Sequence, residues 1–237
     1  MKQHSALAPY GAVHAYGLGD LLSEQARSRP DMVAVIDGTN NKLIKFFELA
    51  NGKPLNFNID HVLDILEINL NQTEQTTERK IAFIDANREL SITGAQEGCG
   101  QDIDDLDSFI WHDQFDILAS ISDNKLITYY YPNVVYIDKD LVELCMQSKE
   151  APEIGRMSQM LTFTSSQVSV RRKDGGLITL GVSPYPRILF DFCDKNRWEK
   201  AIKLCRFVKE PILWACMAAV SMKARELSTA EIAFAAI

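Results

Sequence analysis

The sequence predicts a β-propeller followed by the start of an α-solenoid of helical hairpins. Two observations lead to this fold class. Short β-branched strands joined by polar turns recur between residues 30 and 182. Apolar residues take up helical spacing after Ser183. We therefore expect three parts: an N-terminal segment at 1–29 that matches no pattern, a partial propeller at 30–182, and the first helices of a TPR-like α-solenoid at 183–237.

The propeller prediction depends on one repeated strand–turn–strand unit. Its first strands contain Val35, Phe83, Ala119 and Phe163, and a polar turn and a second strand follow each of them. Aligning these four positions gives spacings close to the period of about 40–45 residues that is typical of propeller blades. A small sheet cannot bury both of its faces alone, so the units must stack, and a propeller achieves this. From the pattern alone, a stacked β-sandwich remains open.

The helical part begins at a pair of prolines. Pro184 and Pro186 break the sheet, and Pro186 suits the first turn of a helix. Pro211 suits the start of a later helix. Apolar residues recur at helical spacing between these points, namely Trp198, Ala201, Ile202, Cys205 and Val208.

Two capping boxes are expected at helix starts, formed by Asn196 with Glu199 and by Ser228 with Glu231. The last helix is expected to run to Ile237, because no Gly or Asn follows to end it. From this we expect the chain to be a piece of a longer helical array.

Composition narrows the function class. The net charge of −7 argues against nucleic-acid binding, which needs a basic face. The one compact basic run, 171–173, is interpreted as a solvated turn. Five cysteines have wide spacings and form no CxxC pair, so we expect free thiols in a reducing compartment and no metal. We find neither a secretory signal nor an apolar run long enough for a membrane span.

No catalytic signature is visible in the sequence. P-loop, GxSxG and HExxH motifs are absent, and the four histidines are scattered. His112, at the end of a predicted strand, is interpreted as a surface histidine rather than a catalytic base. The acidic residues at 102–107 lack the glycine and the distal Glu of a calcium loop, so they are expected to form a solvated loop. We therefore expect no enzyme, no cofactor and no metal; a propeller enzyme would need converging acids or histidines.

The aromatic residues are the candidates for an interaction site. Tyr129 and Tyr131 should share one strand face and Tyr130 should take the other. Exposed tyrosines anchor many protein interfaces, whereas packing between blades is the competing interpretation. Trp198 and Trp214 are expected to be largely buried where the solenoid begins.

The same segments resemble the family of the eighty-kilodalton subunit of intraflagellar transport complex B. The run Tyr129-Tyr130-Tyr131-Pro132-Asn133 is similar to the last blades of the family's second propeller, and the segment KIAFIDANR at 80–88 resembles an earlier blade. The segment WEKAIKLCRFVKE at 198–210, followed by Trp214-Ala215-Cys216, resembles its first solenoid helices. The resemblance covers about residues 30–237, although Tyr129 stands where the family commonly has Trp.

The resemblance implies later blades of a WD40-like propeller and a non-catalytic scaffold role. It implies protein–protein contacts for cilium assembly and axonemal transport, with other complex B subunits as partners. It also implies self-association through the solenoid of the full-length protein, and a location in the axoneme, basal body and cytoplasm. The alternative is a subunit of another propeller–solenoid assembly, either intraflagellar transport complex A or a vesicle coat.

Overall fold

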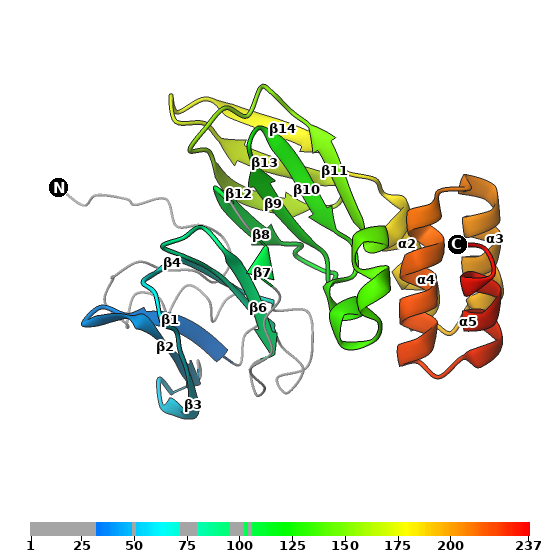
Figure 1. The fold of residues 1–237 in the computed structure, drawn as a ribbon, viewed down its shortest axis with the longest axis horizontal. Coiled ribbons are helices and arrows are strands. Elements are labelled where there is room, and N and C mark those ends of the chain that lie inside the picture. Colours follow the sequence, from blue (N-terminus) through cyan, green and yellow to red (C-terminus); the bar gives the residue numbers. More distant parts are fainter. Residues whose placement is uncertain (1–31, 49–50, 72–79, 95–101, 104–105) are drawn as a thin grey trace.

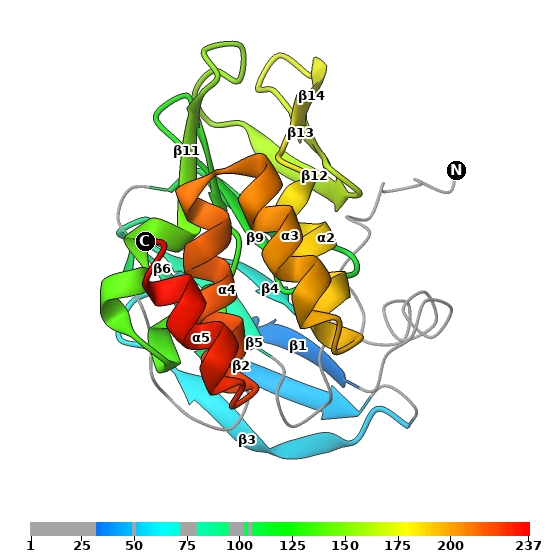
Figure 2. The ribbon, with the colours of Figure 1, turned by 90° about the vertical axis from the view of Figure 1, so that its right-hand side faces the viewer.

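The chain folds as a row of small antiparallel sheets followed by helices (Figure 1). The structure is a computed structural model, and it describes residues 32–48, 51–71, 80–94, 102–103 and 106–237. Within these residues there are four sheets, which we call the first to fourth sheets in chain order. The described α-helices come after the last sheet and lie together on the face turned toward the viewer in Figure 2.

The strands of each sheet follow one another along the chain, so each sheet is a simple meander. The first sheet contains β1 (Met32–Asp37), β2 (Asn40–Glu48) and β3 (Pro54–Asp60). The second contains β4 (Ile65–Leu70), β5 (Lys80–Asp85), β6 (Leu90–Gly94) and β7 (Asp102–Ile103). The third contains β8 (Ser108–Trp111), β9 (Leu118–Ser122), β10 (Lys125–Tyr129) and β11 (Met146–Glu150). The fourth contains β12 (Gln159–Thr164), β13 (Gln167–Arg171) and β14 (Leu177–Gly181).

Two groups of helices complete the described fold. Three short 3-10 helices connect β10 to β11: η1 (Pro132–Tyr136), η2 (Lys139–Leu141) and η3 (Glu143–Cys145). Four α-helices follow β14: α2 (Tyr185–Asp194), α3 (Trp198–Val208), α4 (Pro211–Lys223) and α5 (Leu227–Phe234). Helix α4 contacts η3, so the helices pack against the third sheet through its η connection.

The sheets are arranged as propeller blades, with the first strand of each sheet against the first strand of the next. These contacts join β1 to β4, β4 to β8, and β8 to β12. Strand β5 shows how a sheet is buried on both faces, because Ile81 and Phe83 pack toward the first sheet while Ala82 and Ile84 pack toward the third. This alternation follows from the two-residue period of a strand.

One apolar cluster extends from the third and fourth sheets into the helices. It includes Tyr130 beside β10, Val168 of β13, Leu189 of α2 and Ala215 of α4, all buried. Helix α4 is apolar around most of its circumference, and the residues from Leu213 to Ala219 are buried. A helix that is apolar all round belongs inside a core, so α4 is the central element of the helical part.

The predicted fold class is confirmed as propeller blades followed by C-terminal helices. The predicted repeat register is wrong, however. Val35 and Phe163 lie on the first strands of their sheets, whereas Phe83 and Ala119 lie on second strands. Strand β4, which the repeat had omitted, is the first strand of the second sheet. The predicted boundary near 183 stays a prediction, and the segment 1–29 lies outside the described residues.

Two of the four α-helices begin with a proline in the first turn, and the two expected capping boxes do not form. Pro186 lies in the first turn of α2 and Pro211 begins α4, as predicted. Neither expected capping box forms: α3 begins after Arg197 and α5 after Glu226, and neither residue makes a side-chain cap. Asn196 instead adopts a left-handed conformation with φ of 53°, which turns the chain between α2 and α3. The last helix ends at Phe234 rather than Ile237.

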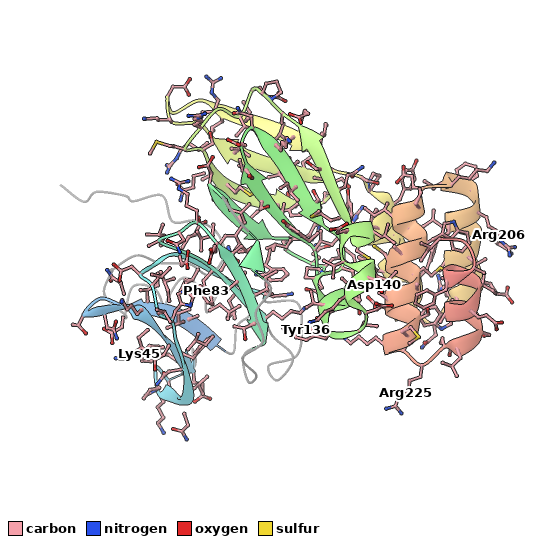
Figure 3. The ribbon with its side chains drawn as sticks, in the orientation of Figure 1. Lys45, Phe83, Tyr136, Asp140, Arg206 and Arg225 are labelled. Atoms are coloured by element: carbon pink, nitrogen blue, oxygen red, sulfur yellow. The ribbon has the colours of Figure 1, made fainter. Side chains whose placement is uncertain are left out.

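Charged residues lie on the outer side of the helical part. Arg206 of α3 and Arg225 after α4 project away from the sheets (Figure 3). The basic run 171–173 is exposed at the turn between β13 and β14, as expected for a solvated turn. Among the described residues, no helix is long and apolar enough to cross a membrane.

Candidate protein-binding site

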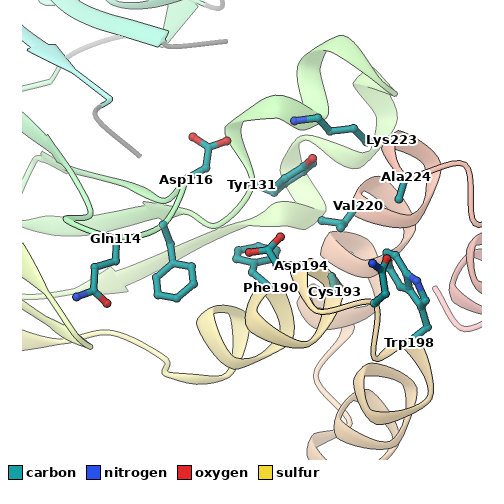
Figure 4. A pocket seen from close by; sticks show the side chains of 12 residues that line it. Gln114, Asp116, Tyr131, Phe190, Cys193, Asp194, Trp198, Val220, Lys223 and Ala224 are labelled. Atoms are coloured by element: carbon teal, nitrogen blue, oxygen red, sulfur yellow. The ribbon is translucent and has the colours of Figure 1, made fainter. Parts of the chain in front are cut away.

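A pocket of about 430 Å³ lies where the third sheet meets the helices (Figure 4). We call it the junction pocket. Its sheet side comes from the β8–β9 connection and the end of β10, and its helical side comes from α2, the start of α3 and the end of α4. The lining residues are Gln114, Phe115, Asp116, Tyr131, Phe190, Cys193, Asp194, Asn196, Trp198, Val220, Lys223 and Ala224.

The chemistry of the junction pocket combines aromatic walls with a charged rim. The rings of Tyr131 and Phe190 lie tilted against each other with their centroids 5.7 Å apart, and Trp198 is half-buried on the opposite side. Asp194 and Lys223 are exposed at the rim. Partial burial of the carboxyl and the nearby Asp191 raise the pKa of Asp194, although Lys223 and Lys195 oppose this shift. Aromatic walls with a few polar groups are typical of sites that bind a side chain of another protein.

Asp116, at the base of the pocket, connects two blades. Its Oδ2 lies 2.6 Å from Nζ of Lys80, on the neighbouring second sheet, and both side chains are buried. Asn71 donates to Oδ1 at 2.7 Å and Asn133 donates to Oδ2 at 2.6 Å. The Lys80 ammonium also lies 5.6 Å from the ring centroid of Trp111. A buried charge needs such partners, so this network holds the pocket's base in place.

The structure separates the three tyrosines differently from the prediction. Tyr129 packs between the second and third sheets, whereas Tyr130 and Tyr131 both pack toward the helices. The expected pairing of Tyr129 with Tyr131 on one face is wrong, because β10 ends at Tyr129. Burial raises the pKa of Tyr129 to about 12. The buried Tyr130 donates its hydroxyl to Oε1 of Gln147 at 2.6 Å.

Only part of the predicted aromatic set meets at the pocket. Tyr131 and Trp198 line it, whereas Trp214 of α4 packs in the core cluster nearby. Trp214 is buried, and Trp198 is only half-buried. Whether these residues contact a partner protein stays a prediction.

His112 is not the surface residue expected from the sequence. It is buried, and its Nε2 lies 3.0 Å from the carbonyl oxygen of Ser165 in the fourth sheet. The backbone N–H groups of Gln114 and Phe115 donate to Nδ1. Burial lowers the pKa of His112, although the bond to Ser165 opposes this shift. The neutral imidazole therefore links the third sheet to the fourth and fixes the loop that forms one pocket wall.

Four thiols lie in the core cluster of the helices and the last two sheets, and one of them, Cys193, lines the junction pocket. Cys145, Cys193, Cys205 and Cys216 are free and buried. Burial raises the pKa of Cys193 and of Cys205 to about 12, and raises that of Cys216 well above its ordinary value. Within the described part of the chain, no group of three or more His, Cys, Asp or Glu side chains is arranged to hold a metal ion. Cys99, Asp104 and Asp105 lie outside the described residues.

The fold and the pocket define a class of β-propeller proteins whose blades continue directly into helices. The family model described as "IFT80 second beta-propeller" matches residues 19–185. The chain is 39% identical over 226 residues to the intraflagellar transport protein 80 homolog of Mus musculus and 40% identical to that of Rattus norvegicus. The chain therefore belongs to the intraflagellar transport protein 80 family.

The curated relatives are much longer than this chain. Each match covers 92% of this chain but 29% of the relative. Among solved structures, the computationally designed Ika4 protein matches with a TM-score of 0.43 and 11% identity, over 65% of this chain and 88% of that chain. KlHsv2 with loop 6CD replaced by a Gly-Ser linker gives 0.32 and 10% identity, over 59% and 58%. The likeness in overall shape is slight.

Proposed function

We propose that this chain is part of a non-catalytic scaffold subunit of intraflagellar transport complex B. It makes protein–protein contacts that serve cilium assembly and axonemal transport. The observation that carries this proposal is the 39–40% identity to intraflagellar transport protein 80 homologs over 92% of the chain. A fold may host many functions, so the sequence relationship carries more weight than the propeller itself.

The structure supplies a surface suited to this role. The junction pocket presents the rings of Tyr131, Phe190 and Trp198 beside the charged groups of Asp194 and Lys223. Aromatic residues are enriched at the centre of protein interfaces, where one buried anchor contributes much of the affinity. We infer that an apolar side chain of a partner subunit fills this pocket.

The partners we propose are the other complex B subunits, and the proposed location is the axoneme, the basal body and the cytoplasm. Self-association through the solenoid is part of the same proposal for the full-length protein. The alternative subunit, of complex A or of a vesicle coat, receives no support from the family match, which names the second propeller of intraflagellar transport protein 80.

The test is affinity purification from ciliated cells in which the tagged full-length protein replaces the native one. Mass spectrometry should recover the complex B subunits, and fluorescence should show the protein along the axoneme. Recovery of complex A or coat subunits in place of complex B would contradict the proposal.

Two matched variants ask whether the junction pocket takes part. Ala224→Trp places a large side chain at the pocket's exposed rim, and Arg206→Trp adds the same side chain where α3 faces away from the sheets. We expect Ala224→Trp to lose at least one subunit and Arg206→Trp to retain all of them. Equal recovery with both variants would show that no partner uses the pocket.

A further inference from the structure

Among the described residues, the fourth sheet has three strands, whereas the two sheets before it have four. In the second and third sheets a fourth strand, β7 or β11, pairs antiparallel with the third strand. The pairing of β10 with β11 includes all five residues from Lys125 to Tyr129. The fourth sheet ends at β14, which pairs on one side with β13. Among the described residues, no strand pairs with its other side.

The backbone groups on this free side can be identified from the hydrogen bonds that flank the strand. Gly176 O accepts from Arg172 N–H, and Val182 N–H donates to Ser166 O. Gly176 and Val182, which flank β14, therefore point their backbone polar groups toward β13. Orientation alternates along a strand, so Ile178 and Leu180 also point toward β13. The N–H and C=O groups of Leu177, Thr179 and Gly181 therefore point outward. Gly181 O fits this assignment, because it accepts from Lys149 Nζ of β11, at 3.5 Å, and not from β13.

The surface around β14 suits an added strand. Leu177 is 70% exposed although it is a large apolar residue. A methyl group added at Gly181 would meet no heavy atom within 4 Å. Leu180 is buried in the core cluster, and Ile178 packs against that cluster from a half-buried position. A strand beside β14 would extend this apolar face and satisfy the outward backbone groups, which is the arrangement of β-strand addition.

A lysine stands at each end of β14. Lys149 lies beside Gly181, and Lys173 lies in the turn that leads into Leu177, where its Nζ contacts Met157 Sδ at 3.6 Å. Both are exposed, and within the described ranges neither has a carboxylate oxygen within 4.0 Å. Arg172, by contrast, already pairs with Asp174. Charge complementarity therefore favours acidic residues at both ends of the added strand.

We propose that β14 is a docking strand, which pairs antiparallel with an extended segment of a different polypeptide that is acidic at both ends and apolar between them. This assigns an interaction surface that is separate from the junction pocket and does not depend on the identity of the assembly.

Hydrogen exchange measured by mass spectrometry tests this assignment on the full-length protein. The protein is purified alone after recombinant expression, and also with its native partners from ciliated cells. Within peptides covering Leu177–Gly181, the outward amides of Leu177, Thr179 and Gly181 should exchange rapidly in the protein alone and about tenfold or more slowly in the native assembly, because paired amides are protected. The amides of Ile178 and Leu180, which bond to β13, should be protected in both. Protection in the protein alone would mean that its own chain or a second copy covers β14, and equal rapid exchange in both would mean that nothing pairs with it. Either result overturns the proposal.

Two variants at one position show whether the slower amide exchange comes from strand pairing or from another cause. Thr179→Pro removes an outward backbone N–H, while the bonds between β13 and β14 remain. Thr179→Val keeps that N–H and has a side chain of similar shape. In the native assembly, Leu177 and Gly181 should lose protection with Thr179→Pro and retain it with Thr179→Val. Melting temperatures of the two free variants should agree, which shows that the proline leaves the sheet intact. The proposed function is judged separately, by which subunits co-purify.

Discussion

Lys80 and Asp116 form a buried ion pair between the second and third sheets, with Nζ and Oδ2 2.6 Å apart. Each side chain is at most 9% exposed. Asp116 also accepts hydrogen bonds from Asn71 and Asn133, so one carboxylate joins two blades to η1. Removal of either charge would leave the other buried without its partner.

We predict that Lys80→Met lowers the free energy of unfolding by about 3–5 kcal/mol, the range for breaking a buried pair. Urea unfolding followed by circular dichroism measures this. The control is Lys125→Met, which breaks the exposed pair with Glu150 and should cost less than about 1 kcal/mol. Similar losses in the two variants would show that burial does not distinguish these pairs.

Glu67 gives a prediction about pH. Burial raises the pKa of its carboxyl from 4.5 to about 7, although hydrogen bonds from Ser108 and from the backbone of Phe109 partly oppose this shift. Between these two values the folded state binds more protons than the unfolded state, so this group makes stability fall as pH rises. Glu67→Gln should remove that fall, and the variant should gain up to roughly 3 kcal/mol over the wild type between pH 4.5 and 7.

The measurement is urea unfolding of wild type and variant at several pH values, read as the difference between them. The lowered pKa of His112 changes stability with pH in the opposite sense, but this contribution is common to both proteins and cancels in the difference. Exposed Glu153→Gln is the control and should follow the wild type. A difference between the wild type and Glu67→Gln that does not change with pH would contradict the raised pKa of Glu67.

The two tryptophans of the helical part should differ in their contribution to stability. Trp214→Ala removes a buried ring from α4 and should cost about 3–5 kcal/mol. Trp198 is half-buried, so Trp198→Ala should cost roughly 1–2 kcal/mol. Denaturant unfolding of the two variants under one condition tests the order, and a larger loss for Trp198→Ala would reverse our assignment of the core.

The buried thiols should react slowly in the folded protein. The thiolate is the reactive form, and burial raises the pKa of Cys193 and Cys205 to about 12. We predict that a Cys99→Ser variant reacts with a thiol reagent at pH 8 about 100-fold or more slowly when folded than when unfolded in guanidinium, because thiolate fraction and access both decrease. Rapid labelling of any remaining thiol in the native protein would contradict this.

Local sequence signals predicted the hairpins well. Phe83 lies on a strand, β5 at Lys80–Asp85, that a turn joins to a second strand, as predicted. The turn at Asp123-Asn124 adopts positive φ, as turn residues of this type allow. The capping boxes failed because the chain turns through Asn196 and Arg225, both with positive φ, two residues before α3 and α5 begin. Capping patterns depend on backbone geometry that residue type alone does not determine.

The candidate site was predicted only in part, because its residues come from distant parts of the chain. Tyr131 and Trp198 were both named as candidates, but the sequence did not predict that the two would line one pocket. The ion pair of Lys80 with Asp116 and the buried His112 depend on how adjacent sheets stack. A lysine beside a polar segment carries no local sign of burial, so no pattern within one strand could have found it.

The distribution of the apolar clusters has a mechanical consequence. One continuous cluster joins the helices to the third and fourth sheets, whereas the first sheet shares a smaller cluster with the second. A load applied at α5 would pass into the two last sheets together before it reached the first two. The interface between the second and third sheets, which includes the Lys80–Asp116 pair, would then transmit the tension from the last two sheets to the first two.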